Sequence, residues 1–441
     1  MRRAVPATFR GRLILIGIFA LAVRVAYALT LGRHSNGLGD FHFYNWSADL
    51  IAQGHGYVDP FKLIDGHGYA ATATHPPLWS CVLSVSSWIF GSSSHIGDFA
   101  PAAFVPHRMT SALVGTGAVV AVGLLGRKVG GARTGLIAAL LAAVYPEMVA
   151  TDGSVMSESL YALLLVTALV LAYRVLEQPT WKRGLALGLV IGLATLTRSE
   201  SGLLLLIVAV PAAWRAPARW RVIGAAVLGA AVLLVPWGVR NYSVFHQVVP
   251  VSTNEGAGIG GANCATTYHG QLIGYTDFTC LSKADPKLNE AQQSDHWRSQ
   301  GITYAKHHAG RLPVVVLARV GRAFDLYQTR WQTRLAEAHP PKVEGVAVAV
   351  YILLLPVALL GVLVLRRRGA PLFILLAPAI TTVVAATTIH GLPRYSYGFQ
   401  VVMVVLCASA ALHVYDRREA LRRVLRAPLG PDGPAELEVS R

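Results

Sequence analysis

The stretch VAVAVYILLLPVALLGVLVL occupies residues 346–365 and is followed directly by Arg366, Arg367 and Arg368. A helix of about 20 apolar residues is long enough to cross the hydrocarbon core of a bilayer. Basic residues directly after such a segment are typical of its cytoplasmic end. The stretch therefore predicts a transmembrane helix, and the rest of the chain repeats its pattern.

Nine further apolar stretches have spanning length. They lie near 13–31, 108–126, 134–150, 158–175, 184–198, 201–214, 222–239, 371–389 and 396–414. A shorter run at 77–90 is too short to span comfortably, and we expect a surface or re-entrant helix there. The predicted fold is an all-α polytopic membrane protein with about ten transmembrane helices.

The first apolar stretch has features of a secretory signal peptide, because four arginines precede it and Ala26-Tyr27-Ala28 mimics a cleavage site. It is long enough to span, however, and Arg24 interrupts it. We therefore expect it to remain as the first transmembrane helix.

The composition agrees with a membrane protein. The 441 residues carry 39 Lys and Arg against 23 Asp and Glu, a formal net charge of +16, yet only 14% are charged and 54% are hydrophobic. Soluble domains carry about 25% charged residues. The composition excludes a disordered chain and does not fit an ordinary soluble enzyme. The four cysteines show no zinc spacing, so the sequence predicts no metal-ligating residues.

The basic residues sort to one side of the membrane if the run at 77–90 is not a crossing. More than half of them fall in the N-terminal arm, the loops after the second, fourth, sixth and eighth spans, and the tail from Arg417. The positive-inside rule then places both termini in the cytoplasm. Because these residues form no single stripe with stacking aromatics, nucleic-acid binding is not expected.

This topology divides the chain into four parts. Residues 1–239 form an N-terminal module of seven spans, whose first outer loop at 32–107 carries catalytic candidates. Residues 240–345 form a large extracytoplasmic loop, 346–415 the last three spans, and 416–441 a cytoplasmic tail. The end of that tail is rich in Pro and Gly and is predicted to be disordered.

The first outer loop contains three polar candidates. Asp40 and Tyr44 lie at helical spacing in an amphipathic segment at 40–51, which suits a helix on the membrane surface. Asp40 at its start has an alternative role as an N-cap. His75 precedes Pro76-Pro77 at the membrane interface, where a structural role is the competing interpretation.

Asp152 and Glu158 flank the start of the fourth span. Carboxylates in a membrane protein are costly unless they face a cavity, although capping and the helix dipole explain one of the two. Arg24 is expected to pair with an acid such as Glu147 or Asp152. Within Arg198-Ser199-Glu200, a local ion pair is the favoured interpretation.

Two arginines emerge at the outer interface from helices that are distant in sequence. Arg240 follows the seventh span, and Arg394 lies between the ninth and tenth. Together they could hold a lipid phosphate, since guanidinium groups bind phosphate bidentately. For either one alone, a snorkelling side chain is the simpler explanation.

The segment at 249–261 is rich in glycine but lacks the lysine of a nucleotide-binding loop, which favours a flexible outer loop that closes over a substrate. Cys264 and Cys280 follow on the oxidising side, and we predict a disulfide between them.

Four segments, taken in order, resemble motifs of membrane glycosyltransferases of the GT-C fold, closest to the family of protein O-mannosyltransferases and lipid A aminoarabinose transferases. Gly39-Asp40 through Tyr44 is similar to the catalytic Asp motif, and His75-Pro76-Pro77-Leu78 to a Lys/Arg-Pro-Pro-Leu element. Ser157-Glu158-Ser159-Leu160 resembles a Ser-Glu-Pro-Leu helix start, and Pro236–Tyr242 with Pro250–Asn254 resembles a Pro-Trp-x-x-Arg-Asn-Tyr segment. The resemblance covers about residues 10–415.

The resemblance implies an inverting sugar transfer from a polyprenyl-phosphate donor to an acceptor hydroxyl on a glycan, lipid or protein. The transfer would take place at the outer face of a bacterial cytoplasmic membrane and serve the cell envelope. Asp40 would act as general base, and the residues expected to contact substrate or phosphate are Tyr44, His75, Asp152, Glu158, Arg240 and Arg394. The sugar, a hexose or pentose, is not specified. Because Phe41 follows Asp40 and His75 replaces a permanent cation, the resemblance leaves a divalent metal open.

Two other functions fit the same composition. A lipid or sugar transporter or flippase would also carry intramembrane charge, and a non-catalytic lipid-binding protein would not need Asp40. The polar residues gather on one face rather than at the midplane, and no inverted repeat is seen, which favours the transferase.

Overall fold

The computed structural model describes residues 8–33, 39–91, 96–97, 99–334 and 339–426. Within these residues the fold is helical, apart from a single antiparallel bridge between Val58 and Ala71. The predicted disorder at the end of the tail falls on 427–441, outside the described residues.

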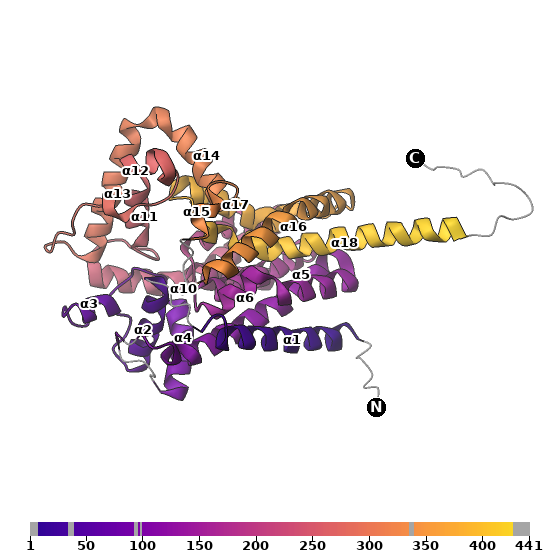
Figure 1. Ribbon diagram of the computed structural model, residues 1–441, viewed down its shortest axis with the longest axis horizontal. Helices are drawn as coiled ribbons and strands as arrows, with labels where there is room; N and C mark the ends of the chain where they lie inside the picture. The colour runs from indigo at the N-terminus through magenta and orange to yellow at the C-terminus, as the bar shows by residue number, and fades with distance from the viewer. Residues whose placement is uncertain (1–7, 34–38, 92–95, 98, 335–338, 427–441) are drawn as a thin grey trace, which may run out of the picture.

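A bundle of long helices forms the body of the molecule (Figure 1). Its members include α1 (Phe9–Leu29), α5 (Val105–Val144), α7 (Glu158–Glu177), α16 (Pro341–Arg367) and α18 (Tyr397–Arg426). Their facing sides carry the largest apolar core, rich in Ala, Val and Leu. These small and branched side chains let the helices pack closely without a polar partner.

Three further bundle helices are α8 (Trp181–Thr195), α10 (Arg219–Phe245) and α17 (Leu372–Thr388). A Cβ at Gly188 of α8 would lie 1.9 Å from the carbonyl oxygen of Ala226 in α10, so this glycine permits the close approach. Shorter segments complete the bundle and loops: α6 (Pro146–Gly153), α9 (Val210–Ala213), and single turns at Pro101–Phe104, Ser199–Leu203, Leu205–Ala209, Gly270–Leu272, Phe278–Cys280, Ala309–Arg311 and Pro393–Ser396.

Six helical segments within the described residues are long and apolar enough to cross a membrane. One of them, Pro101–Val144, covers the predicted crossing at 108–126 and most of the one at 134–150. Gly131 lies between the two and breaks the segment with non-helical backbone at φ 86° and ψ −179°. The predicted spans at 184–198, 201–214 and 371–389 correspond to shorter helices. The structure is that of a multi-pass membrane protein, while the exact number of spans stays a prediction.

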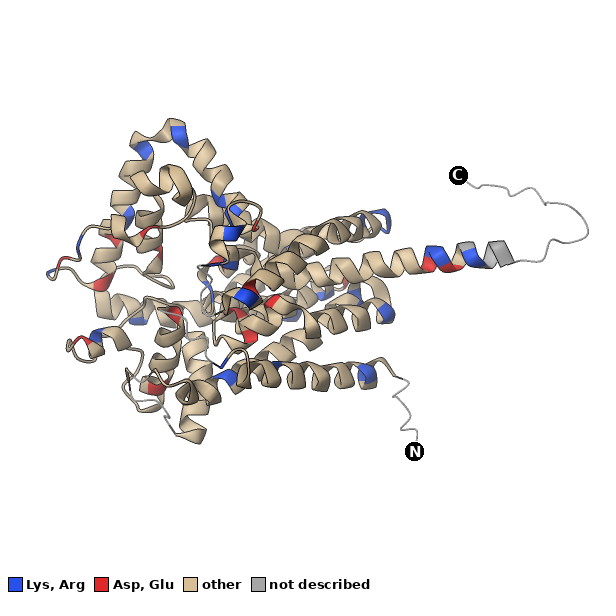
Figure 2. Ribbon diagram, viewed as in Figure 1, with Lys and Arg blue, Asp and Glu red and all other residues tan. Residues whose placement is uncertain are grey.

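Lys and Arg lie at the end of the bundle where α1 begins and α18 ends, and further ones lie in the loops at the opposite end (Figure 2). The predicted topology requires Lys and Arg at the first of these two ends. Three helices cross the predicted boundaries: α10 continues to Phe245, α16 begins at Pro341, and α18 continues through the predicted start of the tail to Arg426.

The first outer loop folds into α2 (Asp40–Ala52), α3 (Pro60–Ile64) and α4 (Leu78–Phe90). The helix at 40–51 is therefore present, but its predicted place on the membrane surface is wrong. Residues 41–50 are all buried, because α2 packs against α4 and beneath the aromatic side chains of Phe61 and Phe104. The short run at 77–90 forms the helix α4, and its predicted surface or re-entrant placement stays a prediction.

The large loop contains α11 (Asn254–Ala262), α12 (Ala265–Tyr268), α13 (Glu290–His307), α14 (Leu312–Ala323) and α15 (Thr329–Gln332). Cys264 and Cys280, the pair for which the sequence predicts a disulfide, are bonded. The expected flexible segment at 249–261 is instead mostly α11. Its glycines allow contact with α13, since a Cβ at Gly256 would lie 2.0 Å from the carbonyl oxygen of Ser294.

Candidate active site

A cavity of about 610 Å³ lies where the first outer loop and the large loop meet the bundle. It is lined by Asp40 and Tyr44 of α2, by His75, by the turn at 197–200 and by Arg394 between α17 and α18, with part of α11 on the opposite side. Four of the predicted site residues thus reach one cavity, although more than 300 residues separate the first from the last.

The carboxylate of Asp40 points to two nitrogen groups. Its Oδ2 accepts a hydrogen bond from Nη1 of Arg394 at 2.7 Å, and its Oδ1 lies 3.4 Å from Nε2 of His75. The alternative role as an N-cap does not apply, because Gly39 is the N-cap of α2 at φ 75°. The side chain of Asp40 is therefore available to the cavity.

Arg394 also binds Glu158, and this begins a chain of ion pairs. Its Nε lies 2.8 Å from Oε1 of Glu158, which also accepts a bond from Arg198. Arg198 in turn binds Glu200 at 2.6 Å, as the local ion pair expected from the sequence. These five groups alternate in sign, and three carboxylates against two guanidiniums leave a formal charge of −1.

The electrostatic surroundings set the charge states of Asp40 and His75. Burial raises the pKa of the Asp40 carboxyl, but the charges of His75, Arg394 and Arg198 outweigh it and lower that pKa to about 2. Burial lowers the pKa of His75 in spite of the opposing charge of Asp40. At neutral pH Asp40 is therefore ionised, and Arg394 is its permanent cationic partner.

Aromatic side chains position His75. The Tyr57 hydroxyl donates to the carbonyl oxygen of His75 at 2.9 Å, and the Phe43 ring lies 4.6 Å from the imidazole. The Tyr44 hydroxyl lies 3.5 Å from Nδ1 of His75 and 3.4 Å from Oγ of Ser157. Because burial raises the pKa of Tyr44, its hydroxyl stays protonated and able to donate.

Arg240 is not among the residues that line this cavity. Its guanidinium donates to the carbonyl oxygens of Thr72 at 2.7 Å and Tyr57 at 3.0 Å, and it lies over the Trp237 ring at 4.8 Å. These contacts hold the first outer loop against the end of α10. Arg240 therefore supports the loop that carries His75 and does not itself line the cavity.

Asp152 is also placed elsewhere. Its Oδ2 accepts a bond from Nε of Arg24 at 2.6 Å, and both side chains are buried. This is one of the two partners expected for Arg24. The guanidinium also donates to the carbonyl oxygens of Ala142 and Ala143 near the end of α5.

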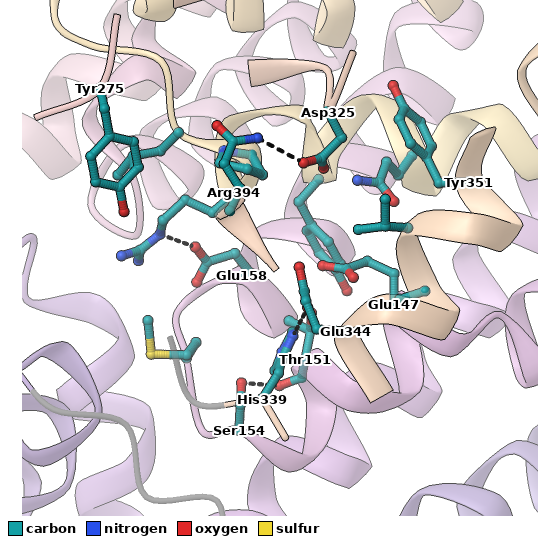
Figure 3. Close-up of a pocket in the computed structure, with 18 residues that line it drawn as sticks. Glu147, Thr151, Ser154, Glu158, Tyr275, Asp325, His339, Glu344, Tyr351 and Arg394 are labelled. Atoms are coloured by element: carbon teal, nitrogen blue, oxygen red, sulfur yellow. Dashed lines mark hydrogen bonds and ion pairs between the residues drawn. The ribbon is translucent and has the colours of Figure 1, made fainter. Parts of the chain in front are cut away.

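Two clusters of polar residues in the structure do not follow from the sequence. Arg198 was expected to bind Glu200 alone, yet it also binds Glu158 from another helix. A second cavity of about 80 Å³, lined in part by Glu158, adjoins the first and shares Tyr275, Leu392 and Arg394 with it (Figure 3). Its other charged residues come from α6, α16 and the segment after α14, and no spacing in the sequence signals that they meet.

Comparisons with known proteins agree with the fold and the motifs. Residues 74–239 match the sequence model of the dolichyl-phosphate-mannose-protein mannosyltransferase family. This match includes His75 and Glu158, whereas Asp40 and Arg394 lie outside it. No curated protein sequence matches the chain.

Solved structures share the fold at low sequence identity. A crystal structure of the Archaeoglobus fulgidus oligosaccharyltransferase with zinc and sulfate aligns at TM-score 0.56 and 17% identity, covering 95% of this chain and 51% of that one. The same organism's oligosaccharyltransferase AglB with an inhibitory peptide and a dolichol-phosphate aligns at TM-score 0.54 and 16% identity, covering 97% and 52%. The chain spans about half the length of these structures.

The family match covers the middle of the chain, and the shared fold extends over nearly all of it. Both point to the same class of protein that the four motifs indicated. The resemblance of this chain to membrane glycosyltransferases of the GT-C fold is therefore confirmed.

Proposed function

We propose that the protein is an inverting glycosyltransferase. It moves a sugar from a polyprenyl-phosphate donor to an acceptor hydroxyl, with Asp40 as general base. The observation that carries the proposal is the ionised Asp40 carboxylate, 2.7 Å from Arg394 in a cavity of about 610 Å³. A base and a phosphate-binding cation thus share one space large enough for a sugar.

The charge of the cavity limits where a donor phosphate can bind. The ion-pair chain is already negative by one unit, so an added phosphate would be repelled unless it takes an arginine from a carboxylate. Arg394 is the better candidate for this exchange, because its side chain is 23% exposed and that of Arg198 is 8% exposed. Its planar guanidinium suits phosphate oxygens.

The exchange also addresses the weakness of Asp40 as a base. A carboxylate whose pKa is about 2 accepts a proton poorly from a hydroxyl. When Arg394 turns to the donor phosphate, Asp40 loses a cationic neighbour, and burial raises its pKa. The base is then strongest when the donor is in place, which discourages reaction without it.

The chemical step is a displacement at the anomeric carbon. Asp40 takes the acceptor proton while the acceptor oxygen forms a bond to that carbon. The bond to the phosphate oxygen breaks on the opposite face, and its electron pair leaves with the lipid phosphate. Arg394 stabilises the negative charge that develops there. Attack from the face opposite the leaving group inverts the anomeric configuration.

The other residues have supporting roles. Glu158 positions both Arg394 and Arg198 through its two ion pairs. His75 and Tyr44 line the cavity beside Asp40, where they can hydrogen-bond sugar hydroxyls or phosphate oxygens. Arg240 and Asp152 act at a distance, by fixing the first outer loop and the bundle.

We assign the reaction to the outer face of a bacterial cytoplasmic membrane, with both termini in the cytoplasm. The disulfide between Cys264 and Cys280 supports this side for the large loop, because disulfides persist in oxidising compartments. The acceptor is a glycan, lipid or protein of the cell envelope. The AglB structure contains a dolichol-phosphate, which supports a lipid-linked donor here.

The test uses the full-length protein purified in detergent. Mass spectrometry of its co-purifying lipids should detect a glycosylated polyprenyl phosphate, and adding that donor with an acceptor should release polyprenyl phosphate. Ordinary phospholipid alone, with no turnover of mannosyl or arabinosyl polyprenyl phosphates, would overturn the proposal in favour of a transporter.

A further inference from the structure

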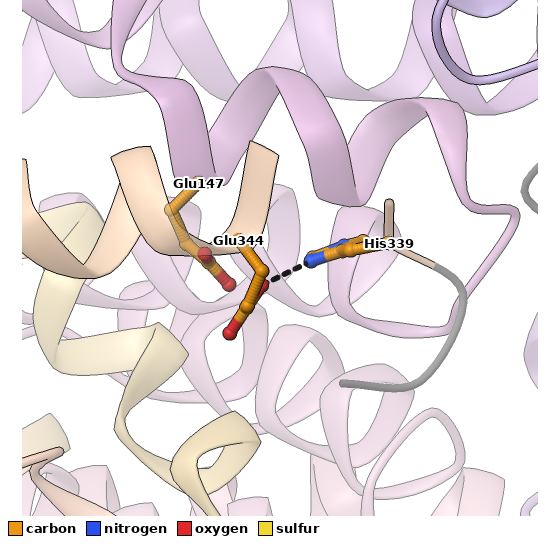
Figure 4. Close-up of side chains that lie close together, drawn as sticks. All are labelled: Glu147, His339 and Glu344. Atoms are coloured by element: carbon orange, nitrogen blue, oxygen red, sulfur yellow. Dashed lines mark hydrogen bonds and ion pairs between the residues drawn. The ribbon is translucent and has the colours of Figure 1, made fainter. Parts of the chain in front are cut away.

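The second cavity contains a cluster of metal-ligating side chains from three places in the chain (Figure 4). Glu147 of α6, His339 and Glu344 of α16 each offer one ligand atom, and these atoms lie within 4.8 Å of one another. Nδ1 of His339 is 2.8 Å from Oε2 of Glu344. The cluster lies in the cavity that adjoins the larger one, and Arg394 lines both cavities.

A position at the start of a helix explains each glutamate of the cluster by itself. It does not explain why two glutamates lie close together. Glu147 and Glu344 both lie in the first turn of their helices, where the dipole favours negative charge. Two helix starts that converge bring these charges together, which is unfavourable unless a cation, either protonated His339 or a metal ion, lies beside them. Among the described residues, neither glutamate forms an ion pair with a Lys or Arg.

A second observation points to a ligand in the same space. Tyr351 and Tyr397 also line the cavity, each is about 1% exposed, and neither hydroxyl has a hydrogen-bond partner among the described residues. A buried hydroxyl without a hydrogen-bond partner destabilises the folded state. An ion with bound water would supply the missing partners, and about 80 Å³ is enough room for both.

We propose that Glu147, His339 and Glu344 bind a divalent metal ion, with Zn²⁺ as the preferred occupant. One imidazole nitrogen and two carboxylates form the mixed nitrogen and oxygen donor set that suits Zn²⁺ and, less well, Mn²⁺. Mg²⁺ prefers oxygen alone and holds its water, so it fits worse. The metal displaces the proton that His339 and Glu344 now share, and that proton leaves to solvent.

The bound metal joins α6 to the start of α16 and so fixes one wall of the small cavity. The site is assigned from its own residues and does not depend on the proposed transferase activity. Failure of either proposal therefore leaves the other standing.

The test measures metal content in the full-length protein, purified with a tag free of histidine. After treatment with EDTA and incubation with Zn²⁺, Mn²⁺ or Mg²⁺, unbound metal is removed and the protein is analysed by elemental mass spectrometry. We expect about one Zn²⁺ per wild-type chain and at least a tenfold loss in His339→Asn and Glu147→Gln. His307→Asn, at an exposed histidine of α13, is the matched control and should keep the metal.

X-ray absorption of the zinc-loaded wild type keeps the test independent of variant folding. It should show nitrogen and oxygen neighbours with the scattering pattern of one imidazole. A sulfur neighbour would place the ion at a cysteine and overturn the proposal. So would a wild type that retains neither Zn²⁺ nor Mn²⁺, or folded variants that retain as much as the wild type.

Discussion

The carboxylate of Asp40 and the guanidinium of Arg394 are in contact at 2.7 Å, although 354 residues separate them. The first belongs to the start of α2, and the second to the connection between α17 and α18. Their contact joins the first outer loop to the last helices of the bundle. It also fixes the charge state of the proposed base.

Asp40→Asn should remove activity while the protein still folds. The amide keeps the size of the side chain but cannot take a proton, and general-base catalysis contributes about 10²–10⁴ in rate. The measurement is kcat for donor consumption in detergent.

Asp59→Asn is the matched control for this substitution. Asp59 is the N-cap of α3, and Asn caps helices about as well as Asp. The control should keep wild-type kcat. An Asp40→Asn protein with unchanged kcat would exclude Asp40 as the base.

Arg394→Gln should weaken donor binding and also change the pH profile. Loss of a charge-assisted hydrogen bond costs about 1.5–3 kcal/mol, which corresponds to a KM about 10–100-fold higher. In the free enzyme the pKa of Asp40 is about 2, so its protonation does not limit kcat/KM above about pH 4. Without the guanidinium burial raises that pKa, and kcat/KM should fall at a higher pH than in the wild type.

The control for the Arg394 variant is Arg298→Gln, at an exposed arginine of α13 that binds Asp295. It should leave both KM and the pH profile unchanged. If kcat/KM fell at the same acidic pH in Arg394→Gln and in the wild type, the proposed effect of Arg394 on the pKa of Asp40 would be contradicted.

His75 should make the folded state less stable as the pH falls. Burial lowers its pKa in the folded protein below the ordinary value of 6.5, so the unfolded chain binds the proton more tightly. The contribution is therefore present above about pH 6.5 and is lost as the pH falls below it. The measurement is the change in Tm between pH 7.5 and pH 5, which should be smaller in His75→Gln than in the wild type.

A change in Tm of equal size in both proteins would mean that other groups account for the pH dependence. His390 is one such group, because burial lowers its pKa to about 3. His390→Gln therefore serves as the comparison that separates the two histidines.

Local sequence patterns predict the helices of this fold. They do not predict which helices pack against one another. Long apolar runs predict the bundle helices because membrane-spanning segments satisfy their own backbone hydrogen bonds. The amphipathic pattern at 40–51 predicts α2 but not its burial, since Phe99 and Phe104 also pack against its polar residue His42. The glycines at 256–260 suggest flexibility until α13 packs against them.

The site residues show the same limit. Motifs predict Asp40 and His75 as site residues, and the position of Arg394 at the outer interface predicts the third; all three line one cavity. Glu147, His339 and Glu344 belong to no sequence motif. They lie together because the starts of α6 and α16 are close in the tertiary structure. Arg240 has a motif of the family, yet its contacts with backbone carbonyls were not foreseeable from sequence.

Arg240→Ala should lower stability without a large effect on the donor. The arginine donates to the carbonyl groups of Thr72 and Tyr57. Its removal leaves the Thr72 carbonyl without this donor, while that of Tyr57 still accepts from the Thr72 backbone N–H at 3.3 Å, and we expect a cost of about 1–3 kcal/mol. Tm should therefore fall, while donor KM stays within about threefold of the wild type for the fraction that is folded. A KM rise as large as that of Arg394→Gln, with Tm unchanged, would instead restore Arg240 as a phosphate-binding residue.

The buried pair of Arg24 and Asp152 should behave as a coupled unit. Asp152→Asn leaves the guanidinium without its counter-charge, and breaking a buried ion pair costs about 3–5 kcal/mol. Arg24→Met leaves the carboxylate alone and also frees the carbonyl groups of Ala142 and Ala143, so we expect the larger loss in Tm. In the double variant no unpaired charge remains, and its Tm should lie above the value expected from adding the two single losses. Strictly additive losses would mean that the two side chains stabilise the bundle independently, in spite of the 2.6 Å between them.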